Sequence, residues 1–199
     1  MRFHKFISTV LHPVVIPTLG VMLYFIFISQ SLDQRQQFLL LALVFGITYV
    51  IPVIALFLLK ALGLVQSFQV KTIRERRLPI LMMLVLFYVL GDILANTPTL
   101  RDLGFLFYGT SLGLFTTYLL FALRLKSSLH LLSMGSAIGF FLVMINMYSM
   151  SLLPVIMVLI LLSGLVASSR LHLQAHSSKE LLIGFSIGVL SQLVTFWFL

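Results

Sequence analysis

The chain has 199 residues, of which 60% are hydrophobic and only 9% are charged, and it contains no cysteine. A soluble domain carries about 25% charged residues, so this composition excludes a soluble enzyme and indicates an integral membrane protein. The lack of cysteine excludes disulfides, thiolate metal sites and cysteine nucleophiles. The net charge of +8 comes from cations between apolar stretches, which favours lipid headgroups or a phosphorylated substrate over nucleic acid as the partner.

Seven apolar stretches are each long enough to cross a bilayer as a helix, which takes about 20 residues. In chain order they cover residues 6–30, 36–60, 78–97, 103–124, 130–148, 151–168 and 180–199. We expect helices rather than barrel strands, because the apolar runs do not alternate with polar residues. The first stretch has no small-residue cleavage site, so it is expected to be a retained helix. The prediction is an all-α polytopic transmembrane bundle of six to seven spanning helices, with residues 1–199 forming one domain.

Basic and nearly neutral connections alternate along the chain. Residues 64–79, 124–130 and 168–180 are basic, whereas residues 29–37, 96–104 and 146–150 are nearly neutral. Because spans come in pairs, the basic connections and the N-terminus are expected to lie on one face of the membrane. The positive-inside rule makes that face cytoplasmic, and the expected location is a bacterial inner membrane. The orientation stays open, because cations that bind substrate do not report topology.

Three prolines and several glycines have expected structural roles. Pro17, Pro52 and Pro154 fall inside predicted spans and are expected to kink them. The glycine pairs at positions 109/113 and 135/139 have the spacing of helix contact points.

The basic face gathers side chains suited to a phosphate group. Arginine offers forked donors to a tetrahedral oxyanion, lysine offers a point charge, and histidine acts as nucleophile or general acid near neutral pH. His176 and Glu180 are four residues apart, so at a helix start they share a face and the glutamate could orient the imidazole. Ser177 or Ser178 is expected to cap that helix. The converging residues are Lys71, Arg76, Arg77, Arg170, His130, His176 and Glu180.

Three segments resemble, in order, the signatures of the type 2 phosphatidic acid phosphatase superfamily. Its third signature, SR-x5-H-x3-D, is similar to SR-x5-H-x3-E in this chain, formed by Ser169, Arg170, His176 and Glu180. The second, PSGH, is similar to SSLH at 127–130, and the first, K-x6-RP, resembles KTIRERRLP at 71–79. The chain departs from these signatures at Leu78, Ser127 and Leu129, where the family has arginine, proline and glycine.

The resemblance implies metal-independent hydrolysis of a lipid phosphomonoester or diphosphate through a phosphohistidine, with no cofactor. It implies that His176 is the nucleophile, that Glu180 orients it, and that His130 protonates the leaving oxygen. It assigns phosphate binding to Lys71, Arg77, Ser128 and Arg170, with Arg76 as a rival of Arg77. The implied partners are a phosphorylated lipid substrate and membrane lipids. Neither the particular lipid nor the oligomeric state is predicted.

A different class of protein stays open. The altered second signature also fits a catalytically inactive lipid-phosphate binder or scaffold, or a transporter-like bundle. A transporter should show a polar path through the membrane, and Asp92 with a few prolines is all the sequence offers. For Asp92 we expect a helix-interface role, with a pathway role as the alternative. His4 and His12 are expected to be interfacial, whereas His172 could line the site.

Overall fold

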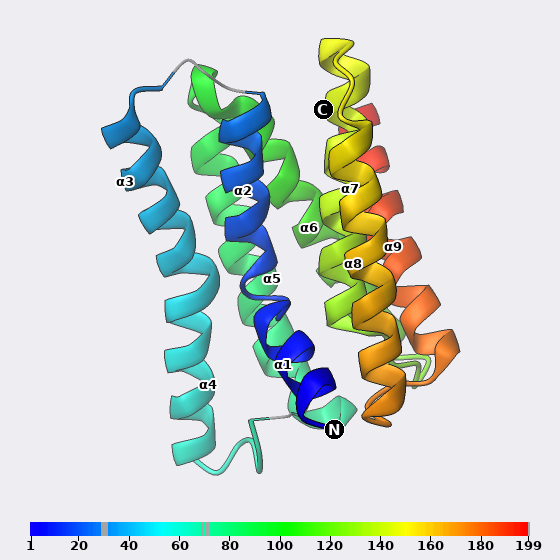
Figure 1. The fold of residues 1–199 in the computed structure, drawn as a ribbon. Coiled ribbons are helices and arrows are strands. Elements are labelled where there is room, and N and C mark those ends of the chain that lie inside the picture. Colours follow the sequence, from blue (N-terminus) through cyan, green and yellow to red (C-terminus); the bar gives the residue numbers. More distant parts are fainter. Residues whose placement is uncertain (29–31, 69, 71, 199) are drawn as a thin grey trace.

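The structure, a computed structural model, describes residues 1–28, 32–68, 70 and 72–198, and every regular element in these ranges is helical (Figure 1). The all-α prediction is confirmed. The helices are α1 (Arg2–Val10), α2 (Ile16–Phe27), α3 (Gln34–Phe45), α4 (Ile51–Ala61), α5 (Ile73–Ala95), α6 (Arg101–Leu120), α7 (Leu129–Tyr148), α8 (Leu153–His172) and α9 (Ser178–Phe198). Within these ranges six helical segments are long and apolar enough to cross a membrane: Gln34–Ala61, Ile73–Ala95, Pro98–Leu120, Leu129–Tyr148, Leu153–His172 and Ser178–Phe198. The protein is therefore an integral membrane protein.

The first predicted span, 6–30, is wrong as a single helix. Helix α1 ends at Val10 and α2 begins at Ile16. Pro13 has no N–H to continue α1, and a proline also restricts the residue before it, so the chain turns here. The His12 carbonyl accepts instead from the N–H of Val15 at 2.8 Å. The 12 residues of α2 extend about 18 Å, well short of the roughly 30 Å hydrocarbon core of a bilayer.

The three prolines that were predicted to kink spans behave differently from one another. Pro17 and Pro154 lie in the first turns of α2 and α8, where a missing N–H costs nothing, so neither interrupts a helix. Pro52 lies in α4, one residue beyond a π-helical turn, Gly46–Val50, that joins α3 to α4. This wider turn, with the Ile51 N–H bonded to the Gly46 carbonyl, accommodates Pro52 and keeps Gln34–Ala61 continuous.

The helices alternate in direction, as the charge pattern predicted. Figure 1 shows α1, the end of α4, the start of α5 and the α6–α7 and α8–α9 connections at one end of the bundle. The ends of α2 and α5, the α7–α8 connection and the C-terminal end of α9 lie at the other. The first end, called the basic end below, carries Arg2, Lys5, Lys60, Arg74, Arg76, Arg77, Arg124, Lys126, Arg170 and Lys179.

Helix α9 packs closely against both α7 and α6. A Cβ atom added at Gly188 of α9 would collide with the Leu132 carbonyl oxygen of α7, so these backbones approach within a distance that only glycine permits. Gly139 and Gly109 leave room for the Gln192 side chain, whose amide donates to the Leu106 carbonyl at 3.0 Å. The glycine pairs are thus helix contact points, as predicted.

The end opposite the basic end is tied by two carboxylates. The Tyr108 hydroxyl donates to Asp92 at 3.0 Å, which links α5 to α6. Asp102 of α6 accepts from the hydroxyls of Tyr24 in α2 and Tyr148 in α7. These contacts support the helix-interface role expected for Asp92.

Candidate functional site

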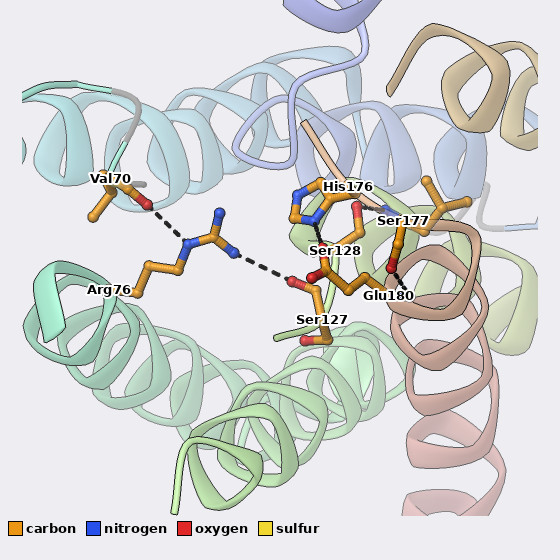
Figure 2. Close-up of polar contacts among 8 residues, drawn as sticks. Val70, Arg76, Ser127, Ser128, His176, Ser177 and Glu180 are labelled. Carbon is orange, nitrogen blue, oxygen red and sulfur yellow. Dashed lines mark hydrogen bonds and ion pairs between the residues drawn. The ribbon is translucent and has the colours of Figure 1, made fainter. Parts of the chain in front are cut away.

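The start of α5 decides which arginine enters the interior. Thr72 caps the helix in a reciprocal capping box with Glu75, so α5 begins at Ile73, five residues before the predicted span. Arg76 and Arg77 are therefore both helical, and their side chains leave the axis about 100° apart. Arg76 points inward, where its Nε donates to the Val70 carbonyl at 2.8 Å and a terminal nitrogen reaches the Ser127 carbonyl at 3.4 Å (Figure 2).

Arg77, the residue predicted to bind phosphate, is exposed on the outside of α5 and does not line the cavity described below. The structure thus favours the rival, Arg76, because the segment is a helix rather than a loop that could absorb a one-residue slip. Lys71, the predicted lysine, lies outside the described residues.

His176 and Glu180 are brought together as predicted. The imidazole Nδ1 lies 2.6 Å from a carboxylate oxygen of Glu180, and the His176 side chain is almost fully buried (Figure 2). An ionised carboxylate only accepts, so Nδ1 carries the proton and Nε2 keeps the lone pair. The predicted cap is Ser177, whose hydroxyl accepts from the Glu180 N–H at 3.3 Å and fixes the start of α9.

His130 and Arg170 meet at a residue that no signature contains. The His130 Nε2 lies 3.1 Å from the Ser8 carbonyl oxygen and 3.4 Å from the Ser8 hydroxyl. A terminal nitrogen of Arg170 donates to the same hydroxyl at 2.8 Å. The Nε of Arg170 is buried and has no hydrogen-bond partner among the residues the structure describes. The guanidinium therefore has one buried donor that these contacts do not use.

Ser128, also predicted to hold phosphate, has a structural role in this arrangement. It is fully buried, does not line the cavity, and caps α7 through its hydroxyl. Its N–H donates to the main-chain carbonyl of Glu180 at 3.0 Å. Ser128 thus joins the start of α7, next to His130, to the start of α9, next to His176.

A cavity of about 250 Å³ joins this cluster to the apolar interior. Its arginine and histidine lining lies at the basic end of the bundle and comprises His12, Arg76, His130, Arg170 and His176. Three hydroxyl side chains, those of Thr110, Ser133 and Ser136, also line it from α6 and α7. Its apolar lining comes from α2, α4, α5, α6 and α7, with Leu56, Phe87, Leu106 and Phe140 among the residues that line it. From His130 to Phe140 the cavity follows α7 for about 15 Å at the rise of an α-helix. One space therefore has a cationic head and an apolar body.

The surroundings keep the two histidines outside the spans neutral. Burial lowers the pKa of His176 below 6.5, Arg76 and Arg170 lower it further, and the Glu180 hydrogen bond opposes the shift. Burial, followed by the charge of Arg170, also lowers the pKa of His12. At neutral pH, His176 is a neutral imidazole beside two guanidinium groups, which is the protonation state of a nucleophile for an anionic phosphorus centre.

Several contacts of the cluster come from the N-terminal segment, which sequence reasoning treated as interfacial. His4 bonds the Ser169 hydroxyl through Nδ1 at 3.2 Å and stacks on His172 at 4.1 Å between ring centroids. His12 lines the cavity and meets the His130 ring edge-on at 5.1 Å. Only the histidine content of the N-terminus hinted at this; Ser8, 122 residues before His130, gave no sequence signal.

The site offers no evident metal position: the described part of the chain has no group of three or more His, Cys, Asp or Glu side chains placed to hold an ion. Comparison of the chain with protein-family models, with curated proteins and with solved structures returned no match.

Proposed function

We propose that this protein is a membrane phosphatase that hydrolyses a phosphomonoester or diphosphate of a lipid through a phosphohistidine, similar to the type 2 phosphatidic acid phosphatases. One observation carries the proposal. The cavity combines two arginines and three histidines at the basic end with an apolar body inside the bundle. This lining is complementary to a molecule with an anionic head and a hydrocarbon tail, and the head lies beside a histidine already held by a carboxylate.

The chemistry follows from the geometry of His176. Its Nδ1 donates to Glu180, so Nε2 attacks phosphorus and forms the N–P bond as the P–O bond to the lipid breaks. Protonated His130 gives its proton to the departing oxygen, and the lipid alcohol or lipid monophosphate leaves. Water then attacks phosphorus while neutral His130 takes its proton, the N–P bond breaks, and inorganic phosphate is released.

The two arginines stabilise the charge that builds up on the phosphoryl oxygens. Arg170 has a buried Nε without a partner in the described structure, which is a donor suited to an oxyanion. Arg76 uses Nε for the Val70 carbonyl and keeps terminal N–H groups for the cavity. Donors fixed before the reaction, in a site that excludes water, are the largest source of rate enhancement in such transfers.

We place the basic end on the cytoplasmic side of a bacterial inner membrane, by the charge count. Cysteines introduced one at a time at Lys179 and Ser149, both exposed and at opposite ends of the bundle, test this in a chain without native cysteine. If a reagent added outside labels Lys179→Cys but not Ser149→Cys, the basic end faces outward and the proposed orientation is wrong.

The test of the function is phosphate release from a panel of lipid phosphates and diphosphates in detergent with EDTA. Wild type should release phosphate, and His176→Ala should reduce release to the background rate, because it removes the nucleophile. The matched control is Lys179→Ala, which removes an exposed side chain three residues away that does not line the cavity. Incubation with a substrate labelled in its phosphate should leave an acid-labile label on wild type but not on His176→Ala, which identifies the phosphohistidine.

A second candidate is a binder of lipid phosphate without turnover, and the engagement of both His130 and Arg170 by Ser8 favours it. It is distinguished by the same panel. A wild type that binds lipid phosphate through Arg170 but releases no phosphate from any lipid would replace the phosphatase proposal with this one.

A further inference from the structure

Helix α1 contacts the candidate site, although it lies outside all three signature segments. Its Ser8 is 8% exposed and reaches two of the residues to which the mechanism assigns a role, His130 and Arg170. The helix is held at the end of α8 by the bond from His4 to Ser169 and by the stacking of His4 on His172. The other face of α1 carries the exposed side chains Phe3 and Phe6. The orientation of α1 therefore directs Ser8 inward.

The Ser8 carbonyl determines how His130 is used. A carbonyl oxygen only accepts, so the Nε2 that lies 3.1 Å from it carries a proton. This hydrogen bond is kept when the imidazole takes up a second proton, as a general acid must. In that form Nδ1 carries the proton that goes to the leaving oxygen. Glu180 holds His176 through Nδ1, and the Ser8 carbonyl holds His130 through Nε2, so each ring keeps one nitrogen for chemistry.

The Ser8 hydroxyl determines where Arg170 points. It accepts from one terminal nitrogen of the guanidinium at 2.8 Å, which fixes the rotation of this planar group. With that nitrogen held, the guanidinium stays among the residues that line the cavity. Loss of the hydroxyl would leave a flexible side chain to find the phosphate at an entropic cost.

We propose that Ser8 is a positioning residue of the site: its carbonyl holds His130 and its hydroxyl aims Arg170. Helix α1 is then a fourth component of the phosphate site, beside the three signature segments. This inference rests on the proposed function for its chemistry. It assigns α1 a role inside the site rather than only at the membrane surface.

Equilibrium binding of a non-hydrolysable lipid phosphonate in detergent micelles tests the hydroxyl without requiring turnover. Ser8→Ala should weaken binding about tenfold or more, the usual effect of losing one hydrogen bond to a charged group, and Ser8→Thr should restore it. Thr9→Ala is the matched control and should bind as wild type does, because the exposed Thr9 hydroxyl bonds only the Lys5 carbonyl of its own helix. With a hydrolysed substrate, Ser8→Ala should raise KM and also lower kcat, because Arg170 is assigned to the charge that builds up in the transition state.

Tighter binding by Ser8→Ala would mean that Ser8 competes with phosphate for Arg170, and unchanged binding would mean that the hydroxyl positions nothing. Either result overturns the proposal.

The carbonyl contact is tested separately by NMR of protein labelled with ¹⁵N-histidine. His130, assigned by its loss in His130→Gln, should show a slowly exchanging Nε2 proton, whereas the exposed His172 should not. A His130 Nε2 without a proton, or one in fast exchange with solvent, would overturn this part. These spectra do not depend on activity. If wild type shows the slowly exchanging proton but does not bind the phosphonate, the proposed function is wrong, whereas the contact between Ser8 and His130 is confirmed.

Discussion

Helix α7 and the α3–α4 segment border the same cavity but differ in how firmly they are packed. In the most apolar window of α7, 78% of the residues are buried inside the protein, against 17% for Gln34–Ala61. The histidines of the proposed mechanism lie on α7 or next to it: His130 is the second residue of α7, and His176 precedes α9, which packs against α7. Helix α4 supplies apolar lining such as Leu56. The residues of the proposed chemistry thus lie on or beside a well-packed helix, whereas the wall of the proposed tail site is loosely packed.

The largest effect is expected from disturbing the packing of α7. Gly188→Val places a branched side chain where the Leu132 carbonyl already touches the glycine, so α7 and α9 must separate. Unfolding should become easier by about 3 kcal/mol, the upper range for overpacking, with loss of phosphate release. Thermal unfolding in detergent, followed by circular dichroism, measures the fall in Tm.

The matched control is Gly164→Val in α8, where an added Cβ meets nothing within 4 Å. Its Tm should stay close to that of wild type. If Gly188→Val and Gly164→Val lower Tm equally, the close contact between α7 and α9 is not what stabilises the bundle.

The second largest effect should come from the carboxylate that orients the nucleophile. Glu180→Gln keeps the size of the side chain but no longer accepts with a full charge from His176 Nδ1, so kcat should fall about 100-fold or more. Glu180→Asp should recover part of the loss. The main-chain bond between Ser128 and Glu180 is independent of the side chain, so Tm should change little. A kcat for Glu180→Gln near wild type would exclude the proposed role of the pair.

The pH profile gives a smaller and more specific signal. The pKa of His176 is lowered below 6.5, mainly by burial, and its neutral form is the nucleophile. Therefore kcat/KM should fall about tenfold per pH unit on an acid limb below pH 6.5, whereas the requirement for protonated His130 sets a separate alkaline limb. Because Glu180 raises the pKa of His176, Glu180→Gln should shift the acid limb to still lower pH. A shift to higher pH would contradict the assignment.

The smallest effect is expected on the α4 wall. Leu56→Trp places a larger ring against the apolar part of the cavity, whereas Leu58→Trp changes an exposed position on the same helix. Both should change Tm only slightly, because α4 is loosely packed. Leu56→Trp alone should raise KM severalfold for long-tailed substrates and less for short-tailed ones. The same KM change in Leu58→Trp would remove the argument that α4 borders the tail.

The fold was largely predictable because apolar length dominates the behaviour of a chain in a membrane. Long apolar runs predicted the spans that follow α2 to within a few residues, and charge alternation predicted the face that each connection occupies. The first span failed because Pro13 stops a helix in a stretch whose composition still looks continuous. The total hydrophobicity of the stretch does not reveal that Pro13 lacks a backbone N–H donor.

The candidate site was predictable only where its contacts are local. The pairing of His176 with Glu180 follows from helical spacing of four residues. The choice between Arg76 and Arg77 depended on where α5 begins, and the capping box of Thr72 and Glu75 decides it. Ser8 lies beyond any local rule, because its partners come from helices packed against α1 in the final fold.

The long separation of Ser8 from its partners also sets an order of events during synthesis. Ser8 is among the first residues made, and it lies 122 residues before His130 and 162 before Arg170. The cluster cannot form until α8 has entered the membrane, so α1 lacks its partners during most of translation. An amphipathic helix with exposed phenylalanines can wait at the lipid surface. A nascent or truncated chain that ends before α8 therefore has Arg76 and His130 but lacks Arg170 and His176, so the proposed catalysis would begin only when insertion is almost complete.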